Sequence, residues 1–219
     1  MPKLTISSAK KISMNQSLTQ PDPFERHRAF RDAMHGQIPP QLLELALTDD
    51  FEPTRLLALR FAGQVEFTPA QKVRAMTDDA DKVRAAAIQC FGHELPPEEH
   101  AKTLFDSSEL VRRNAVCVRP LTDRQRIAML ADPSSAVRAQ VVSLGHLTPA
   151  QHDEALVDPD WLVRARAVEL GGLTKSQLDR AMLDESRQVR EAAEAQGGKK
   201  TIRGSLRDLL YRARNAGLA

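Results

Sequence analysis

An aspartate and an arginine recur together six times in this chain, always with the arginine six residues after the aspartate. The six pairs are Asp49 and Arg55, Asp78 and Arg84, Asp106 and Arg112, Asp132 and Arg138, Asp158 and Arg164, and Asp184 and Arg190. A guanidinium can form a two-bond ion pair with a carboxylate, and a row of guanidinium groups can also bind phosphate. We interpret the residues as a structural ladder between repeated units, with each aspartate also capping the helix after it. Loss of one arginine should then cost stability rather than ligand binding.

Metal, thiol and cofactor chemistry find little support in the remaining residues. The histidines, which we interpret as solvated, form no HExxH or HxxxH pair. Cys90 and Cys117 form no CxxC motif, so both are expected to pack as small side chains, although Cys117 could be a reactive thiol. The chain contains no GxxxxGK[ST], GxGxxG or GxSxG sequence. We therefore predict no catalytic residue, no metal site and no cofactor, and a protein that is not an enzyme.

Short helices must position the repeated pairs. Eleven residues before each aspartate stands an apolar residue followed by Pro or Thr, which are residue types that begin helices. These apolar positions are Ile38, Phe67, Leu95, Leu121, Leu147 and Leu173. Each unit is therefore predicted to hold two helices, one from the Pro or Thr to just before the aspartate and one starting just after it. Isolated helices this short are marginal in water, so stacking of successive units has to supply the burial.

The pattern D-x-x-x-x-V-R-x-x-A on the second of two helices resembles the HEAT repeat, and the compact unit of 26 residues also resembles the leucine-rich variant repeat of bacteria. The resemblance covers residues 38–198, in six units. It implies an all-α, right-handed α-solenoid with a concave face lined by the second helices. A leucine-rich variant protein linked to nitrogen fixation carries an iron–sulfur cluster, but two scattered cysteines do not supply that set of ligands.

The positions that differ between units are the ones free to bind a partner. Two and five residues after the repeat arginine, the second helix is expected to show its outer face, with Leu57 and Ala192 among the apolar members. The candidate partner-binding stripe on this face comprises Arg60, Gln89, Arg113, Asn114, Cys117, Gln140, Ser143, Arg166 and Glu169. Trp161, the only tryptophan, is expected in the turn between two helices, where it either anchors a partner or packs on the next repeat.

Both ends of the chain are basic, whereas its body is acidic. Residues 1–31 carry six Lys or Arg against two Asp or Glu, and residues 199–219 carry six against one. We expect residues 1–20 to be a disordered basic arm, residues 21–37 an N-terminal capping helix, and residues 199–219 a basic amphipathic helix that caps the last repeat. The basic side chains of that last helix are Lys199, Lys200, Arg203, Arg207, Arg212 and Arg214.

Together these features favour a non-catalytic adaptor that presents its concave helical face to a protein partner. The alternative is a nucleic-acid-binding protein that uses the basic ends with Arg113 or Arg166. A HEAT-like DNA glycosylase is a more distant alternative, because such enzymes use aromatic and acidic residues in a cleft and this chain has one Trp and one Tyr. The absence of an apolar run long enough for a membrane span or a secretory signal predicts a cytoplasmic protein. The oligomeric state is left open.

Overall fold

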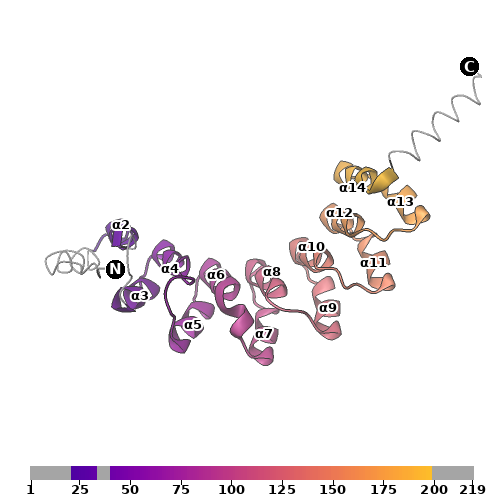
Figure 1. Cartoon of the computed structure of the whole chain (residues 1–219). Helices are drawn as coiled ribbons and strands as arrows, with labels where there is room; N and C mark the ends of the chain where they lie inside the picture. Colours follow the sequence, from indigo (N-terminus) through magenta and orange to yellow (C-terminus); the bar gives the residue numbers. More distant parts are fainter. Residues whose placement is uncertain (1–20, 34–39, 199–219) are drawn as a thin grey trace, which may run out of the picture. The chain divides into compact units, whose positions relative to one another are not determined.

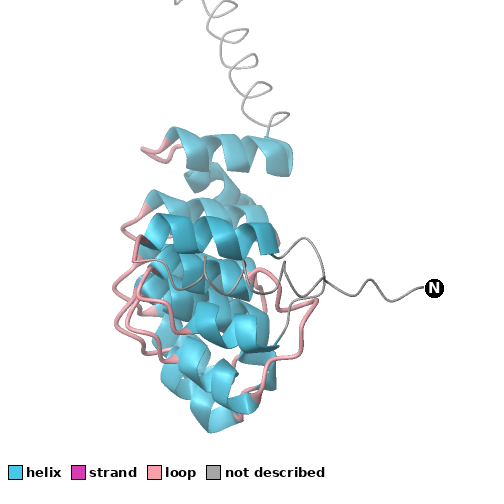
Figure 2. Ribbon diagram, turned by 90° about the vertical axis from the view of Figure 1, so that its left-hand side faces the viewer, coloured by secondary structure: helices cyan, strands magenta, loops and turns pink. Residues whose placement is uncertain are grey.

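The structure is a computed structural model of the chain, and it describes residues 21–33 and 40–198. Thirteen α-helices lie in these residues, and no strand does (Figures 1 and 2). The described residues divide into two compact units, which meet between Arg119 and Pro120. The helices of the first unit are α2 (Pro23–Ala33), α3 (Pro40–Leu47), α4 (Glu52–Leu59), α5 (Pro69–Met76), α6 (Asp81–Phe91), α7 (Pro97–Thr103) and α8 (Glu109–Cys117). Those of the second unit are α9 (Asp123–Leu130), α10 (Ser135–Ser143), α11 (Pro149–Ala155), α12 (Trp161–Leu170), α13 (Lys175–Ala181) and α14 (Arg187–Ala193).

Each repeat consists of a first helix and a second helix that pack against each other, from α3 with α4 to α13 with α14. Within each unit the second helices also pack on one another in sequence: α2, α4, α6 and α8 in the first unit, and α10, α12 and α14 in the second. Figure 1 shows the first helices of each unit on one side of this row. The prediction of an all-α fold built from two-helix repeats is therefore confirmed.

Thr and Pro begin the first helices as predicted. The Thr148 hydroxyl accepts a hydrogen bond from the backbone N–H of Gln151, and the Gln151 side chain accepts one from the backbone N–H of Thr148. The same reciprocal capping box opens α5, α9 and α13. Because this arrangement pairs two backbone donors that a helix start would leave open, it fixes where each first helix begins.

The aspartates do not cap the second helices in the way expected. Each second helix of a repeat begins three residues after the aspartate, as α12 begins at Trp161 after Asp158. The Asp158 carboxylate instead accepts the N–H of Asp160, which is itself the N-cap of α12 and accepts the N–H of Leu162. The aspartate thus closes an Asx turn that leads into the helix, because its carboxylate reaches only two residues forward.

Three positions around the repeat arginine build the core of the second helices. The residue before the arginine and the residue three after it are buried in all six repeats, and the residue four after it is buried in the first five, as Val163, Ala167 and Val168 are around Arg164. The aliphatic residues four after the arginine are Leu59, Ile88, Val116, Val142 and Val168, none more than 2% exposed. Burial of one such side chain stabilises the fold by about 1.5 to 3 kcal/mol. The small residues at the third position let neighbouring second helices approach.

His100 is part of the core rather than solvated as the sequence suggested. Its side chain is 1% exposed, and its ring Nε2 donates to the carbonyl oxygen of Ala115 at 2.8 Å, which ties α7 to α8. Desolvation by burial lowers the pKa of His100, and the charge of Arg119 acts in the same direction. Burial therefore disfavours the charged form of this histidine in the folded protein.

This burial predicts an acid-dependent loss of stability. In the unfolded chain His100 binds a proton near pH 6.5, whereas in the folded chain its lower pKa disfavours that proton. The free energy of unfolding therefore decreases as the pH falls from about 6.5 toward the lower pKa of the folded state, by at most about 1.4 kcal/mol per pH unit. Urea unfolding of wild type and His100→Gln between pH 7.5 and 5 checks this, because a glutamine can keep the bond without titrating. Wild type should lose stability more steeply; parallel pH curves would show that His100 does not contribute.

Several predictions fall on residues outside the described ranges. They concern the arm at residues 1–20, the last residues of the N-terminal capping helix, Ile38, and the basic segment 199–219 with Lys199, Lys200, Arg203, Arg207, Arg212 and Arg214. Of the capping helix predicted for residues 21–37, the structure describes α2, from Pro23 to Ala33.

Candidate functional site

The repeat arginines connect neighbouring repeats through two edges of the guanidinium group. Arg164 Nη1 donates to the backbone carbonyls of Asp158 and Pro159 in its own repeat, at 2.7 and 3.1 Å. Its Nε and Nη2 donate to the two carboxylate oxygens of Asp184 in the next repeat, at 2.8 and 2.9 Å. Equivalent bonds of 2.8 to 3.0 Å join Arg55 to Asp78, Arg84 to Asp106 and Arg138 to Asp158. We refer to each such connection as a rung.

The electrostatics of a rung favour ionised partners. Hydrogen bonds from Arg164 lower the pKa of Asp184, although desolvation by burial opposes them. The same bonds raise the pKa of Arg164. The Arg164 side chain is 9% exposed and that of Asp184 is 13% exposed, so little water competes for either group. Because the Nε and Nη2 donors of these arginines already hold carboxylates, this row offers few donors to a phosphate backbone.

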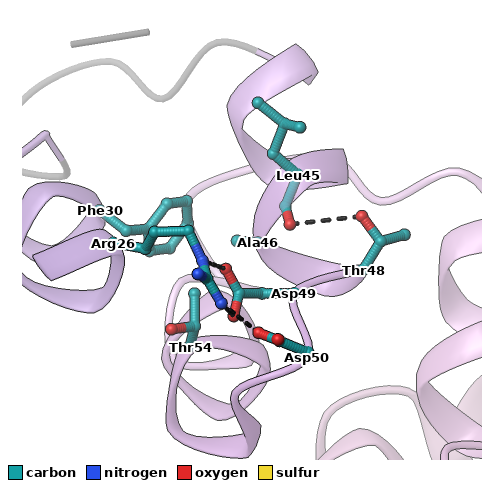
Figure 3. A pocket seen from close by; sticks show the side chains of 8 residues that line it. All are labelled: Arg26, Phe30, Leu45, Ala46, Thr48, Asp49, Asp50 and Thr54. Atoms are coloured by element: carbon teal, nitrogen blue, oxygen red, sulfur yellow. Dashed lines mark hydrogen bonds and ion pairs between the residues drawn. The ribbon is translucent and has the colours of Figure 1, made fainter. Parts of the chain in front are cut away.

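Arg26 forms a rung that the sequence interpretation missed. From α2 it donates Nε and Nη2 to the two carboxylate oxygens of Asp49, at 2.8 and 3.1 Å, and it also pairs with Asp50 (Figure 3). The spacing of 23 residues from Arg26 to Asp49 equals that from Arg55 to Asp78, a signal that could have revealed it. The helix α2 therefore takes the position of a second helix. A pocket of about 340 Å³ lies beside this rung, but the guanidinium that lines it is engaged with carboxylates.

On the outer face of the second helices, exposure was predicted correctly for the position five residues after the repeat arginine and less well for the position two residues after it. Every residue five after the repeat arginine is exposed through the six repeats: Arg60, Gln89, Cys117, Ser143, Glu169 and Ala195. Two residues after the arginine, however, Leu57 and Ala192 are buried, which corrects the expectation for them. That position turns toward the neighbouring second helix, so its exposure depends on the residue present: Asn114 and Gln140 are half-buried and Arg166 is exposed.

Several stripe residues are engaged within their own unit. The Asn114 amide donates to the carbonyl oxygen of Ala85 at 3.0 Å, which joins α8 to α6. The Ser143 hydroxyl donates to Ala139 O at 2.8 Å within α10. Arg60 and Arg113 are exposed and have no ion-pair partner in the part of the chain that the structure describes.

The cysteines show no sign of thiol reactivity. Cys117 is exposed at the end of α8, and Cys90 is half-buried in α6 with its Sγ 3.7 Å from the Leu59 carbonyl oxygen. Desolvation raises the pKa of both thiols, and for Cys117 the charge of Arg113 only partly opposes this effect. A raised pKa keeps each thiol protonated and therefore a weak nucleophile.

Trp161 and two stripe residues meet in one cleft on the second unit. The cleft has a volume of about 520 Å³ and lies between α12 and α14. It is lined by Trp161, Leu162, Ala165, Arg166, Glu169, Gln188, Glu191, Ala192, Ala195 and Gln196. Trp161 is the first residue of α12, not part of the preceding turn as expected, and it is 43% exposed. Of the predicted site residues, the structure therefore brings together Trp161, Arg166 and Glu169.

The cleft combines an apolar floor with a charge-paired rim. Ala165 and Ala192 are 5% and 9% exposed, and their small side chains leave the space beside the Trp161 ring. On the rim, Arg166 pairs with Glu169. On α14, Glu191 pairs with Arg187 at 2.7 Å. Each charged residue of the rim is thus paired with an opposite charge, and the lining itself holds one arginine against two glutamates, which suits an apolar side chain with polar surroundings better than a phosphate.

Five of the cleft residues were not singled out in the sequence, namely Leu162, Ala165, Gln188, Glu191 and Gln196, whereas Ala192 and Ala195 were expected on the outer face of the last second helix. Ala165 and Ala192 are both packing residues in the structure, although Ala192 was expected on the outer face. These two residues also leave a space next to the Trp161 ring. That space forms only because small side chains of α12 and α14 lie opposite each other, which the sequence pattern does not show.

Two features are absent from the residues that the structure describes. Residues 21–33 and 40–198 contain no group of three or more His, Cys, Asp or Glu placed to hold a metal ion. None of the helices in these ranges has both the length and the apolar character that crossing a bilayer requires.

Comparison with known proteins gives matches at the level of structure. No protein-family model and no curated protein sequence matches the chain. The crystal structure of YibA from Escherichia coli is 20% identical with a TM-score of 0.57, and the match covers 96% of this chain and 93% of that one. A leucine-rich repeat variant, described as having a novel repetitive structural motif, is 23% identical with a TM-score of 0.54, over 84% of this chain and 81% of its own. The predicted resemblance is thereby confirmed for the fold: the chain is a helical repeat protein similar to these two.

Proposed function

We propose that this chain is a non-catalytic protein-binding module and that the cleft between α12 and α14 takes an apolar side chain of a protein partner. The observation that carries the proposal is Trp161, a large aromatic ring 43% exposed at the edge of a cleft of about 520 Å³. Tryptophan is among the residues that contribute most to protein–protein binding, especially beside a pocket that excludes water. Helical repeat proteins also offer extended surfaces for such contacts.

The charges around the cleft support a protein partner over the alternatives. Its arginine, Arg166, is engaged by Glu169. Its second carboxylate, Glu191, is engaged by Arg187. Neither carboxylate is positioned as a free general acid or base of the kind that a glycosylase requires. Exposed Arg60 and Arg113 keep nucleic acid as the second candidate, because they have no ion-pair partner among the described residues.

Affinity capture from native cell extract separates these candidates. The tagged full chain is incubated with extract with and without nuclease, and the column is washed at low and at high salt. We expect one protein to be retained after nuclease at high salt, because an apolar contact does not depend on counterion release. Loss of every bound protein after nuclease, with free nucleic acid retained only at low salt, would contradict the protein-binding proposal and favour the second candidate.

The Trp161→Ala variant tests the cleft itself. Truncation of a central aromatic anchor typically costs about 2 kcal/mol or more, so the variant should bind the captured protein about thirtyfold more weakly. Leu183→Ala is the matched control, because Leu183 is 81% exposed and does not line the cleft. Binding is measured by titration of the purified partner. Equal losses in both variants would show that the cleft has no special role.

A further inference from the structure

The surface around the cleft carries more carboxylates than guanidinium groups. The carboxylates of α12, α14 and their caps are Asp160, Glu169, Glu191 and Glu194, and the exposed guanidinium groups are Arg166 and Arg187. Asp160 is the N-cap of α12 directly before Trp161, and Glu194 is the C-cap of α14. The repeat arginines Arg164 and Arg190 donate instead to the loops before their helices. The cleft is therefore surrounded by an excess of negative charge.

The ion pairs that involve the cleft glutamates are exposed and local. Arg166 and Glu169 lie one turn apart on α12, and their side chains are 46% and 48% exposed. Arg187 and Glu191 lie one turn apart on α14, and theirs are 80% and 55% exposed. Solvent-exposed pairs of this kind contribute little to stability, so a cation of a partner can replace the arginine in either pair. The two carboxylates at the caps form no ion pair with another residue of 21–33 or 40–198.

The apolar part and the charged part of the cleft lie at different levels along α12. Trp161, Leu162 and Ala165 occupy the first half of the helix, whereas Glu169 stands in its last turn, which ends at Leu170. The carbonyl end of a helix carries partial negative charge, so it adds to the field of the glutamate. A cation is therefore favoured at the end of the cleft that lies about 12 Å along the helix axis from its start.

We propose that the cleft selects a basic segment of the partner protein, in which an apolar side chain is flanked by lysine or arginine. The apolar side chain packs on Ala165 and Ala192 beside the Trp161 ring. The flanking cations pair with Glu169 and Glu191. The aliphatic stem of a lysine or arginine adds apolar contact, and the face of an indole ring attracts its charge. The inference rests on the proposed function and names the chemistry of the partner.

The fluorescence of Trp161 reports occupation of the cleft directly, because the chain has a single tryptophan. The full-length chain is titrated with a capped pentapeptide whose central leucine is flanked on each side by two lysines, and with the same peptide carrying glutamates in place of the lysines. We expect the lysine peptide to shift the emission of Trp161 and to bind about tenfold more tightly than the glutamate peptide. Added salt should reduce this preference, because the charges involved are exposed.

Two variants that each remove one negative charge test the carboxylates. Glu169→Gln and Glu191→Gln should each weaken binding of the lysine peptide about threefold. Glu154→Gln is the matched control, because Glu154 is an exposed residue of α11 that does not line the cleft. Its affinity for the lysine peptide should equal that of wild type.

Three results would overturn the basic segment as the occupant. They are equal affinity for the two peptides, no response of Trp161 to the lysine peptide, and a shift of the emission when the chain alone is diluted, which would assign the cleft to a second copy. The proposed function fails by a different result, namely a Trp161→Ala variant that binds the captured protein as tightly as wild type does.

Discussion

Replacement of Arg138 by alanine is expected to lower the free energy of unfolding by about 3 kcal/mol, because it leaves a buried carboxylate without its partner. Arg138 holds both oxygens of Asp158 at 2.8 Å and donates to the carbonyl oxygen of Asp132 at 2.8 Å. The two side chains are 13% and 11% exposed, so solvent screens the pair little. Urea unfolding followed by circular dichroism measures the effect.

Two further variants separate the contributions to this loss. Arg124→Ala should change stability by less than about 0.5 kcal/mol, because Arg124 is exposed on the neighbouring helix α9. Arg138→Lys should fall between wild type and Arg138→Ala, because an ammonium keeps the charge but not the planar fork. A variant Arg138→Ala that unfolds like wild type yet no longer binds a partner would contradict the structural role of the ladder.

Replacement of Ile88 by alanine is expected to cost about 3 kcal/mol, through lost burial and the cavity that remains. Ile88 is 0% exposed on α6 and occupies the position four after Arg84, where each repeat places an aliphatic residue except the last. The position lies between second helices that pack tightly, so neighbouring side chains cannot close the space.

Ile127→Ala is the matched control, because it removes the same atoms from a residue that is 60% exposed on α9. Its unfolding free energy should stay within about 0.5 kcal/mol of wild type. Similar losses in the two variants would show that position in the repeat does not determine the cost, and would contradict the core described for the second helices.

The fold could be predicted from the sequence because each repeat contains the same local signals in the same register. Each of these signals is weak by itself, whether it is the Thr that begins a first helix, the aspartate or the arginine. Their fixed spacing over six copies leaves one arrangement that buries every apolar face. The aspartate's turn was mistaken for a cap, since both conformations use a carboxylate that accepts a nearby N–H. Only the backbone geometry shows that Asp158 bonds to Asp160 and that Asp160 caps α12.

The candidate site could be predicted only in part. Trp161 attracted notice because it is the sole tryptophan, and Arg166 and Glu169 because they vary between repeats. The cleft, however, depends on Ala165 and Ala192 being small at the same level on two helices, a relation in space that spacing along the chain does not state. Arg26 was missed for a different reason: no aspartate stands six residues before it, whereas one stands six residues before each of the repeat arginines.

The central claim, that a protein partner binds at the cleft between α12 and α14, is tested most directly by hydrogen exchange with and without the captured partner. The account predicts slower exchange on binding over residues 161–170 and 187–196, with little change in the first helices α9, α11 and α13. Protection confined to those first helices, with none over residues 161–170 and 187–196, would contradict it.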